Sequence, residues 1–584
     1  RTGTLELTGL VVIPSLTEGG GAGTPNGDYF LPSNGCLLLN GSEVIVLTTA
    51  NNYAEVNAAY GLSEGSGSIH GVSIGGYQAF SVYGKLQVDD GYLSSRRSAG
   101  FITWAEVSGE FVINGGTVDA RQMRSSGAVG LAAFYQTGGT LNLRGRLSLT
   151  QNPSTPADIK NATFSGTTYA GDLSGGQATL NINNSENVFS MSGGTINIYD
   201  VTGGNNYAID IFSEEKNINV SGGTINIKPQ GAAGNAFIIR SAAPFYNFVM
   251  DNEGTGNPSV DLYNAAGVSG DLSVLNDLNI LDGDLNARGY NVSVGGDFII
   301  ENGNAYITGE NWTIFNGSGA QNFEVNTATA LDLKKLKVDK PAGTTLTLTG
   351  TQSDITIQDT LSVFSANLVD GGKTLELVNS GTTTSSFIYN SGVHSGAGGI
   401  KISDDDPTVI GGNGVFGNLE LNNTDASTAP VSLAANTRIN GTLTFSQDKL
   451  FDISTYGLTF GEDATVANAG TNRFVQCAGN SGDGGVSRIY TASSTNFTFP
   501  IGAASTEHAE AEYTPASIGF SAALSTYGTV TVIPVGYEHP VLSTGGNNLS
   551  YYWRVKSDGI TGFAGNVTHS FTYSENDVKG TDGN

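Results

Sequence analysis

The best cluster of acidic side chains in the sequence is Asp404-Asp405-Asp406, followed directly by Pro407. Hard cations such as Ca²⁺ favour clustered carboxylate oxygens, so these three aspartates are the candidate metal ligands of the chain. Pro407 and the nearby Gly411-Gly412 mark a loop, and a solvated turn without an ion is the interpretation that we favour. Sugar cleavage would instead need two carboxylates about 5 to 9 Å apart around a bound glycan. We therefore predict no catalytic residue, and no cofactor other than Ca²⁺ at this loop.

Histidine, the side chain that most readily acts as acid, base or metal ligand near neutral pH, is sparse in this chain. No pair of histidines has the His-x-x-x-His spacing of a helical metal site. No Gly-x-Ser-x-Gly sequence lies where a strand would lead into a helix, so a hydrolase-type nucleophile is not indicated. We expect every histidine to be a surface or turn residue. The five are His70, His394, His508, His539 and His569.

One position of a recurring sequence unit carries Asp119, Asn142, Asn197 and Asn226. If these side chains point inward, the amides would stack as a hydrogen-bonded ladder. If they point outward, they would face solvent or could hold sugars. We favour the ladder or the solvent-facing row, because hydrogen bonds between identical stacked amides satisfy them.

The recurring unit itself reads Gly-Gly-Thr-aliphatic-Asn-aliphatic. It begins at Gly115, Gly138, Gly193 and Gly222, and a degenerate copy begins at Gly175. Residues of alternating polarity flank each glycine pair, which predicts strands with one buried face and a tight bend between them. The irregular intervals between copies suit one turn of a β-solenoid with inserted loops better than the roughly 40 to 50 residues of a propeller blade.

We predict an all-β fold, namely a right-handed parallel β-helix (β-solenoid) followed by a C-terminal β-sandwich-like module. Residues 1–100 would form an N-terminal cap and the first coils, with a short helix over Ala50–Tyr60 as a candidate cap. Residues 101–485 would form the β-helix repeats, including Gly-Asp pairs that recur at a constant interval at Gly270, Gly283 and Gly296. Residues 490–584, richer in aromatic side chains, would form the sandwich module, which we expect to be incomplete.

Composition narrows the class of protein. The 584 residues carry a net charge of −27, and only 14% of them are charged. This balance argues against nucleic-acid binding, which needs clustered lysine and arginine. The short basic pieces Arg96-Arg97 and Arg121–Arg124 could contact an acidic glycan. Cys36 and Cys477 would lie many coils apart and cannot form a disulfide, so stacking rather than disulfides should stabilise the chain. No apolar stretch reaches the length of a membrane helix.

Several stretches of the C-terminal half resemble the large secreted, adhesin-like surface proteins of Bacteroidota that the type IX secretion system exports. The resemblance covers roughly residues 270–584, and the N-terminal Gly-Gly-Thr region resembles pectin-lyase-like β-helices. The matching stretches are Leu336–Leu348, Ile439–Phe445, Phe499–Gly502 and Tyr551–Val555. The resemblance implies an extracellular or cell-surface location and contact with the type IX machinery during export. Surface glycans or other cell-surface proteins would be further partners. The sorting domain that would end such a protein is not in this sequence, so the chain could be a piece of a longer one.

These observations favour a non-enzymatic, rigid solenoid that serves as an extracellular structural or adhesin-like protein. About 400 residues in coils of roughly 22 would give some 18 coils, stacked about 4.8 Å apart over about 90 Å. The alternative is a β-helix polysaccharide lyase or hydrolase that acts on acidic glycans. A third interpretation is that the chain is cargo of the export system with no adhesive role.

Overall fold

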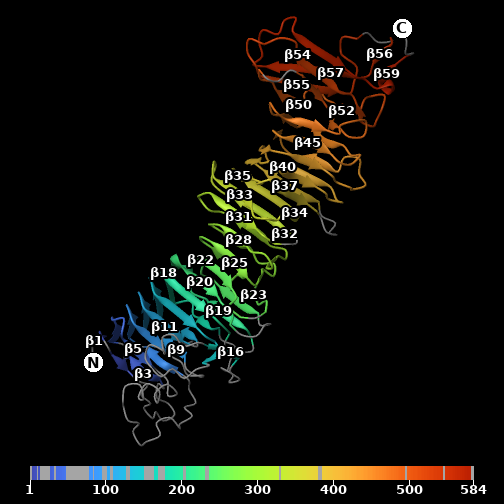
Figure 1. Cartoon of the computed structure of the whole chain (residues 1–584). Helices are drawn as coiled ribbons and strands as arrows, with labels where there is room; N and C mark the ends of the chain where they lie inside the picture. The colour runs from blue at the N-terminus through green and yellow to red at the C-terminus, as the bar shows by residue number, and fades with distance from the viewer. Residues whose placement is uncertain are drawn as a thin grey trace, which may run out of the picture. The chain divides into compact units, whose positions relative to one another are not determined.

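The computed structural model confirms the predicted fold class. The chain is nearly all β, with 53% of residues in strands and 1% helical, and it forms a β-solenoid of about 14 turns with parallel stacked strands (Figure 1). The chain divides into two compact units, Arg1–Asn311 and Trp312–Asn584. The structure describes residues 3–9, 11–13, 27–31, 34–47, 78–82, 84–94, 101–104, 109–120, 122–125, 132–145, 147–149, 164–168, 178–201, 205–230, 236–254, 256–327, 330–378, 385–492, 496–542 and 546–580.

The first unit contains the strands β1 to β29 and one short 3₁₀ helix, η1. Their bounds are β1 Gly3–Leu7, β2 Val12–Ile13, β3 Gly27–Leu31, β4 Gly35–Leu39, β5 Ile45–Leu47, β6 Gln78–Val82, β7 Lys85–Val88, β8 Tyr92–Ser94, β9 Phe101–Trp104, β10 Glu110–Ile113, β11 Thr117–Ala120, β12 Met123–Ser125, β13 Ala133–Gln136, β14 Thr140–Leu143, β15 Leu147–Leu149, β16 Phe164–Thr168, β17 Leu180–Ile182, β18 Val188–Ile198, β19 Tyr207–Ile211, η1 Glu215–Asn217, β20 Ile218–Ile227, β21 Phe237–Ser241, β22 Asn247–Asp251, β23 Ser259–Leu262, β24 Leu272–Val274, β25 Leu278–Asp282, β26 Asp284–Asn286, β27 Val292–Val294, β28 Phe298–Ile300 and β29 Ala305–Ile307.

The second unit contains the strands β30 to β59 and the 3₁₀ helix η2. Their bounds are β30 Trp312–Phe315, β31 Gln321–Val325, β32 Leu331–Asp339, β33 Thr345–Thr349, β34 Asp354–Phe364, β35 Asn367–Val369, β36 Thr374–Leu377, β37 Ser386–Asn390, β38 Val393–Ser395, β39 Gly399–Ile402, β40 Thr408–Gly411, β41 Val415–Phe416, β42 Leu419–Leu421, β43 Val431–Leu433, β44 Thr437–Ile439, β45 Thr442–Phe445, β46 Phe451–Ser454, β47 Gly457–Phe460, β48 Thr465–Ala467, β49 Val475–Cys477, β50 Gly485–Ile489, β51 Asn496–Phe499, β52 Ile501–Ala503, β53 Glu512–Tyr513, β54 Ala516–Phe520, β55 Thr529–Val535, β56 Asn548–Leu549, β57 Tyr552–Asp558, β58 Val567–Phe571, η2 Glu575–Asp577 and β59 Val578–Lys579.

In the first unit the Gly-Gly-Thr copies stack directly on one another. Thr117 pairs with Thr140, Thr140 with Thr195, and Thr195 with Thr224, all in parallel strands. The aliphatic residues on either side of each asparagine, such as Ile196 in β18, are fully buried. Alternation along each strand therefore places the aliphatic side chains in the interior of the coil, as the sequence pattern predicts.

The degenerate copy that begins at Gly175 contributes its described strand to another sheet. This strand, β17, pairs with β12 and β19. The coil from β14 to β18 consequently spans 55 residues, as the Asn142–Asn197 pair shows. The intervals from Gly138 to Gly175 and from Gly175 to Gly193 are therefore parts of a single coil, which includes strand β17 of the second sheet.

The constant interval between the Gly-Asp pairs is also not the coil length. The segments that follow Gly270, Gly283 and Gly296 become β24, β26 and β28, which lie in three different sheets. One coil in this region is instead the longer step from Leu278 in β25 to Phe298 in β28, because these two residues pair across neighbouring strands. Successive Gly-Asp pairs therefore mark successive corners around the solenoid rather than equivalent positions along it.

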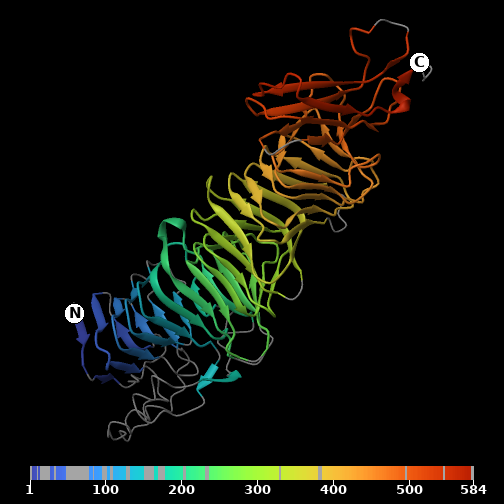
Figure 2. The ribbon, with the colours of Figure 1, turned by 45° about the horizontal axis from the view of Figure 1, so that its top comes forward.

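Coils in the second unit continue in two sheets, and their strands also pair in parallel (Figure 2). The aliphatic positions of the Thr-Leu-x-Leu units are buried, for example Leu346 and Leu348 in β33 and Leu375 in β36. In the chain as a whole, long insertions such as the 55-residue coil of the first unit explain why there are about 14 turns, fewer than coils of uniform short length would give.

Strand pairing changes from parallel to antiparallel at the C-terminal end of the second unit. β50 still pairs in parallel with β47, but its other edge pairs antiparallel with β55, which pairs with β57. A separate three-stranded sheet, β51-β54-β58, is antiparallel throughout. The two layers form the sandwich-like module that the sequence predicts, seen in red in Figure 2.

Two further expectations concern helices. The proposed capping helix over Ala50–Tyr60 lies outside the described residues. In the described part of the chain, no helix has the length and apolar character needed to cross a membrane.

Candidate functional site

The predicted metal ligands Asp404, Asp405 and Asp406 do lie together, in the turn between β39 and β40. One carboxylate oxygen from each lies within 4.8 Å of the others. Asp404 is fully buried, whereas Asp405 is exposed and Asp406 is intermediate. The cluster thus has the donor chemistry of a Ca²⁺ site, with one ligand drawn into the protein.

The contacts of Asp404 show a second role for the same residue. Its carboxylate accepts hydrogen bonds from the Asp406 N–H at 3.2 Å and from the Thr408 hydroxyl at 3.4 Å. Asn423 on the next coil donates to the Asp406 carbonyl at 2.8 Å. These bonds close a turn and fix it to its neighbour, which is the structural use of aspartate in turns.

The asparagine row of the first unit forms a ladder, but on the outer face of the sheet and not on the inner face with which the sequence analysis associates it. The Asn197 amide donates to the Asn142 oxygen at 2.9 Å, and the Asn226 amide donates to the Asn197 oxygen at 2.8 Å. The residues alternate with inward aliphatic side chains, so the ladder lies on the outer face of the sheet. The amides bond to one another across coils, and each bond uses a donor and an acceptor that could otherwise contact a sugar.

Asp119, at the same repeat position, is the first of three related cross-coil clamps. In each clamp an aspartate on one coil binds an arginine on the next coil, and the guanidinium lies over a tyrosine ring. The pairs are Asp119–Arg144 at 2.9 Å with Arg144 4.0 Å from the centroid of Tyr199, Asp210–Arg240 at 2.6 Å with Arg240 3.6 Å from Tyr207, and Asp261–Arg288 at 3.2 Å with Arg288 4.7 Å from Tyr263.

Sequence reasoning missed these clamps because the partners are about one coil apart. Arg240 lies 30 residues after Asp210, and Arg144 lies 25 residues after Asp119. An aspartate with an arginine one coil later is the signal that could have revealed them. Arg96, Arg97 and Arg121, the arginines proposed to meet acidic glycans, lie outside the described residues, as does the side chain of Arg124.

Asp210 is the most buried of the three aspartates. Burial raises the pKa of its carboxyl above the ordinary value, while the hydrogen bond and charge of Arg240 oppose the rise. Arg240 holds it with two bonds, at 2.8 and 2.6 Å. A buried, paired carboxyl on an outer face could be catalytic, but a fully engaged bidentate pair is equally the structure of a fixed ion pair.

His394 contradicts the expectation that every histidine is a surface or turn residue. It lies in β38 inside the coil, and its Nε2 is 3.2 Å from a carboxylate oxygen of Asp370, with both side chains fully buried. Its Nδ1 accepts the Gly417 N–H at 3.2 Å. The imidazole thus bridges three successive coils, and only stacking could show this.

The other described histidines agree with the expectation. His539 and His569 are exposed, and His508 lies in the loop between β52 and β53. His70 lies outside the described residues.

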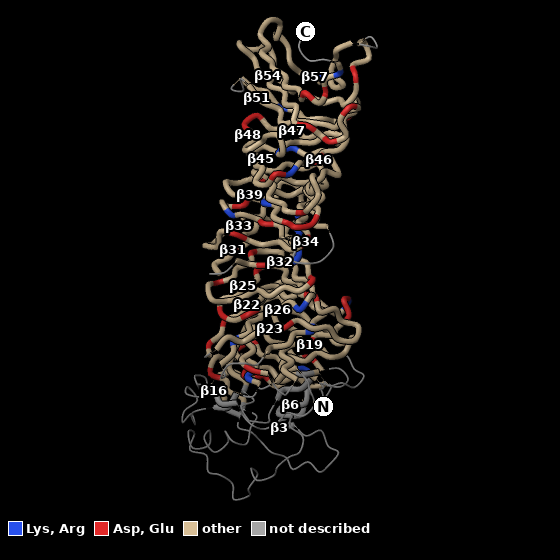
Figure 3. The backbone as a smooth tube through the Cα atoms, turned by 90° about the vertical axis from the view of Figure 1, so that its right-hand side faces the viewer, with Lys and Arg blue, Asp and Glu red and all other residues tan. Residues whose placement is uncertain are grey.

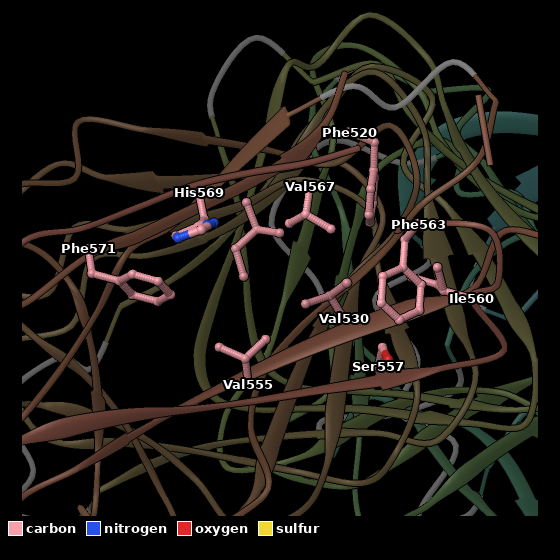
Figure 4. Close-up of a pocket in the computed structure, with 10 residues that line it drawn as sticks. Phe520, Val530, Val555, Ser557, Ile560, Phe563, Val567, His569 and Phe571 are labelled. Carbon is pink, nitrogen blue, oxygen red and sulfur yellow. The ribbon is translucent and has the colours of Figure 1, made fainter. Parts of the chain in front are cut away.

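The C-terminal module contains a cavity of about 330 Å³ between its two layers. One wall comes from β55 and β57, including Val530, Val555 and Ser557, and the other from β54 and β58, including Val567 and His569. Figure 4 shows these side chains directed toward one another across the space. Its volume is at the lower end of the range of ligand pockets, and its lining is mainly apolar with two polar groups. Sequence analysis anticipated the module but none of these lining residues.

Basic residues do not form a continuous stripe along the face drawn in Figure 3, where acidic residues lie among them. Many of the lysines are used in pairs, such as Lys401 with Glu376 at 2.9 Å and Lys335 with Asp359 at 3.3 Å. This arrangement agrees with the excess of acidic over basic residues in the sequence.

Comparisons with known proteins do not suggest a function, so the proposals below are based on the fold and on the sites described above. No family model, no curated protein and no solved structure matches the chain.

Proposed function

We propose that this chain is a non-enzymatic extracellular protein with a structural or adhesin-like role, in which the stacked coils are the scaffold. The observation that carries the proposal is the use of polar groups on the outer faces. The asparagine ladder joins consecutive coils, and so does each of the three clamps. Groups that could otherwise engage a substrate instead fix one coil to the next.

Location and export belong to the same proposal. The acidic composition, the low charge density and the resemblance to surface proteins of Bacteroidota support an extracellular chain exported by the type IX system. Cys36 and Cys477 are both free, so stability rests on stacking. Immunodetection of the native protein in its source organism, and in a strain of that organism that lacks the outer-membrane channel of the system, tests the proposal. We expect surface exposure only in the first, measured by protease digestion of intact cells.

The second candidate function is cleavage of acidic glycans, and Asp210 is the observation that favours it. Its carboxyl is buried on an outer face and has a raised pKa. Such a group can serve as a general acid when a substrate lies within hydrogen-bond reach.

A single assay separates the two functions. The purified chain is incubated with polygalacturonate and alginate, and both reducing ends and ultraviolet absorbance of unsaturated uronides are followed. We expect no release above the level of buffer. Release that Asp210→Asn abolishes, and that the matched Asp405→Asn variant retains, would show an enzyme and overturn the scaffold proposal. Circular dichroism of both variants verifies that they are folded.

Ca²⁺ at Asp404, Asp405 and Asp406 stays a prediction of low affinity. Any binding should be in the millimolar range, typical of weak extracellular sites. Calorimetric titration of the chain with CaCl₂, and of the Asp405→Asn variant as a control, measures it.

A further inference from the structure

The cavity of the C-terminal module is open along one side, between the two strands that end its layers. Among the described residues, β57 pairs only with β55, and β58 pairs only with β54. The opposite edge of each strand therefore has backbone N–H and C=O groups without a strand partner. Long exposed edges of this kind are what proteins normally cover or blunt.

Apolar side chains line this opening and are unusually accessible. Val555 on β57 is 45% exposed, Val567 on β58 is 40% exposed, and Phe563 in the loop between the two strands is 42% exposed. All three line the cavity, and Figure 4 shows them around the same space. In a closed sandwich the inward residues of both layers are buried. Here a further strand with apolar side chains would be needed to bury them.

The face of β57 that points away from the cavity is cationic. Val555 and Ser557 face inward, and the alternate positions Arg554 and Lys556 therefore lie on the opposite face. Lys556 is exposed and makes no ion pair with a described residue, although the chain has 53 acidic residues and a net charge of −27. A strand added beside β57 would be favoured if it placed carboxylates next to these two cations, because opposite charges on neighbouring strands attract.

We propose that this opening, bounded by β57 and β58, accepts an extended segment of a partner protein whose side chains alternate between apolar and acidic. The segment adds to β57 as an antiparallel strand. Its apolar side chains enter the cavity, and its carboxylates face Arg554 and Lys556. Strand addition supplies main-chain hydrogen bonds for affinity and side-chain pockets for specificity. The inference does not depend on the scaffold role, since peptide binding here is compatible with either proposed function.

The probes are labelled seven-residue peptides of alternating valine and glutamate, and of alternating valine and lysine. Fluorescence anisotropy with the full chain measures their binding. We expect the Val/Glu peptide to bind and the Val/Lys peptide to bind more weakly. A Val/Glu peptide with N-methyl groups on its pairing edge should lose binding, because it cannot donate the ladder hydrogen bonds.

Variants of the chain locate the site. Lys556→Glu should weaken binding of the Val/Glu peptide by about fivefold, because one attractive cross-strand charge pair becomes a repulsive one. It should also strengthen the Val/Lys peptide, whereas Lys556→Arg should leave both unchanged. Val567→Asp, at the exposed mouth of the cavity, should abolish binding while circular dichroism shows an unchanged fold.

Four results would overturn the proposal. They are absence of binding at millimolar peptide, equal binding of both peptides, binding that survives N-methylation, and binding that survives Val567→Asp in a folded variant. If light scattering instead shows a dimer that Val567→Asp dissociates, the occupant is a second copy of this chain and the partner assignment is wrong.

Discussion

The two glycines of each corner in the first unit meet different constraints. The second glycine adopts a positive φ, such as 76° at Gly194, which side chains rarely tolerate. The first glycine has ordinary dihedrals, but a Cβ at Gly193 would lie 2.2 Å from the Thr137 carbonyl oxygen of the preceding coil. The pair therefore encodes both the bend of one coil and its close approach to the next.

Gly193→Ala should destabilise the first unit by at least ~2 kcal/mol, because the backbone of two coils must separate to admit a methyl group. The matched control is Gly319→Ala, where a Cβ would meet nothing within 4 Å. Urea unfolding followed by circular dichroism measures both. Equal midpoints for the two variants would contradict this account of the corner.

The Asp370–His394 pair predicts a dependence of stability on pH. Burial alone would raise the pKa of the Asp370 carboxyl, but His394 and the N–H groups of Gly372 and Gly398 outweigh burial and lower it. A carboxyl with a lowered pKa contributes stability above its ordinary pKa, and this contribution is lost as the pH falls through the folded value. The wild-type chain should therefore lose this stabilisation below its ordinary pKa of 3.8.

Asp370→Asn removes the titrating group and tests that sign. The variant should be less stable than the wild type at neutral pH, and the difference should narrow below about pH 4 as Asp370 itself becomes protonated. Urea midpoints between neutral and acidic pH measure the difference. A difference that grows on acidification would mean that the carboxyl is not held in its charged form.

At the scale of the strand, the asparagine ladder ends at a known residue, Asn226. Asn197 is bonded to a neighbour on each side, but Asn226 pairs across the next coil with Val249, which cannot continue the ladder. The ladder therefore contains an interior position and a terminal one on adjacent strands of the same sheet. This difference permits an internal control.

Asn197→Ala should destabilise the first unit about twice as much as Asn226→Ala, roughly 2 against roughly 1 kcal/mol, because it removes two amide hydrogen bonds and not one. Chemical unfolding of both single variants measures the ratio. Equal losses would indicate that the amides act independently and that solvent replaces the bonds between them.

At the scale of the whole chain, stability should be independent of oxidation. Cys36 and Cys477 are free and belong to different units. Cys477 is buried, and burial raises the pKa of its thiol well above the usual range, which suppresses the reactive thiolate.

Dithiothreitol should leave the unfolding temperature unchanged, since there is no disulfide to reduce. Iodoacetamide should label Cys36 in the native chain and Cys477 only in urea, as judged by mass spectrometry of peptides. A fall in unfolding temperature under reducing conditions would be inconsistent with stabilisation by stacking alone.

The sequence by itself determined the fold class and the local elements. Period-two alternation and the glycine pairs predict strands and corners because inward burial and positive φ act within a few residues. The amide row, with Asn197 at its centre, was visible for the same reason.

Only the tertiary structure decided which residues meet across coils. Loops of variable length set the step from one coil to the next, so the 55 residues between Asn142 and Asn197 could not be read as one turn. The same uncertainty hid the Arg240 clamp, the burial of His394 and the opening between β57 and β58. Each depends on which strand becomes the neighbour of which, and that choice is made by packing over the whole coil rather than by local sequence.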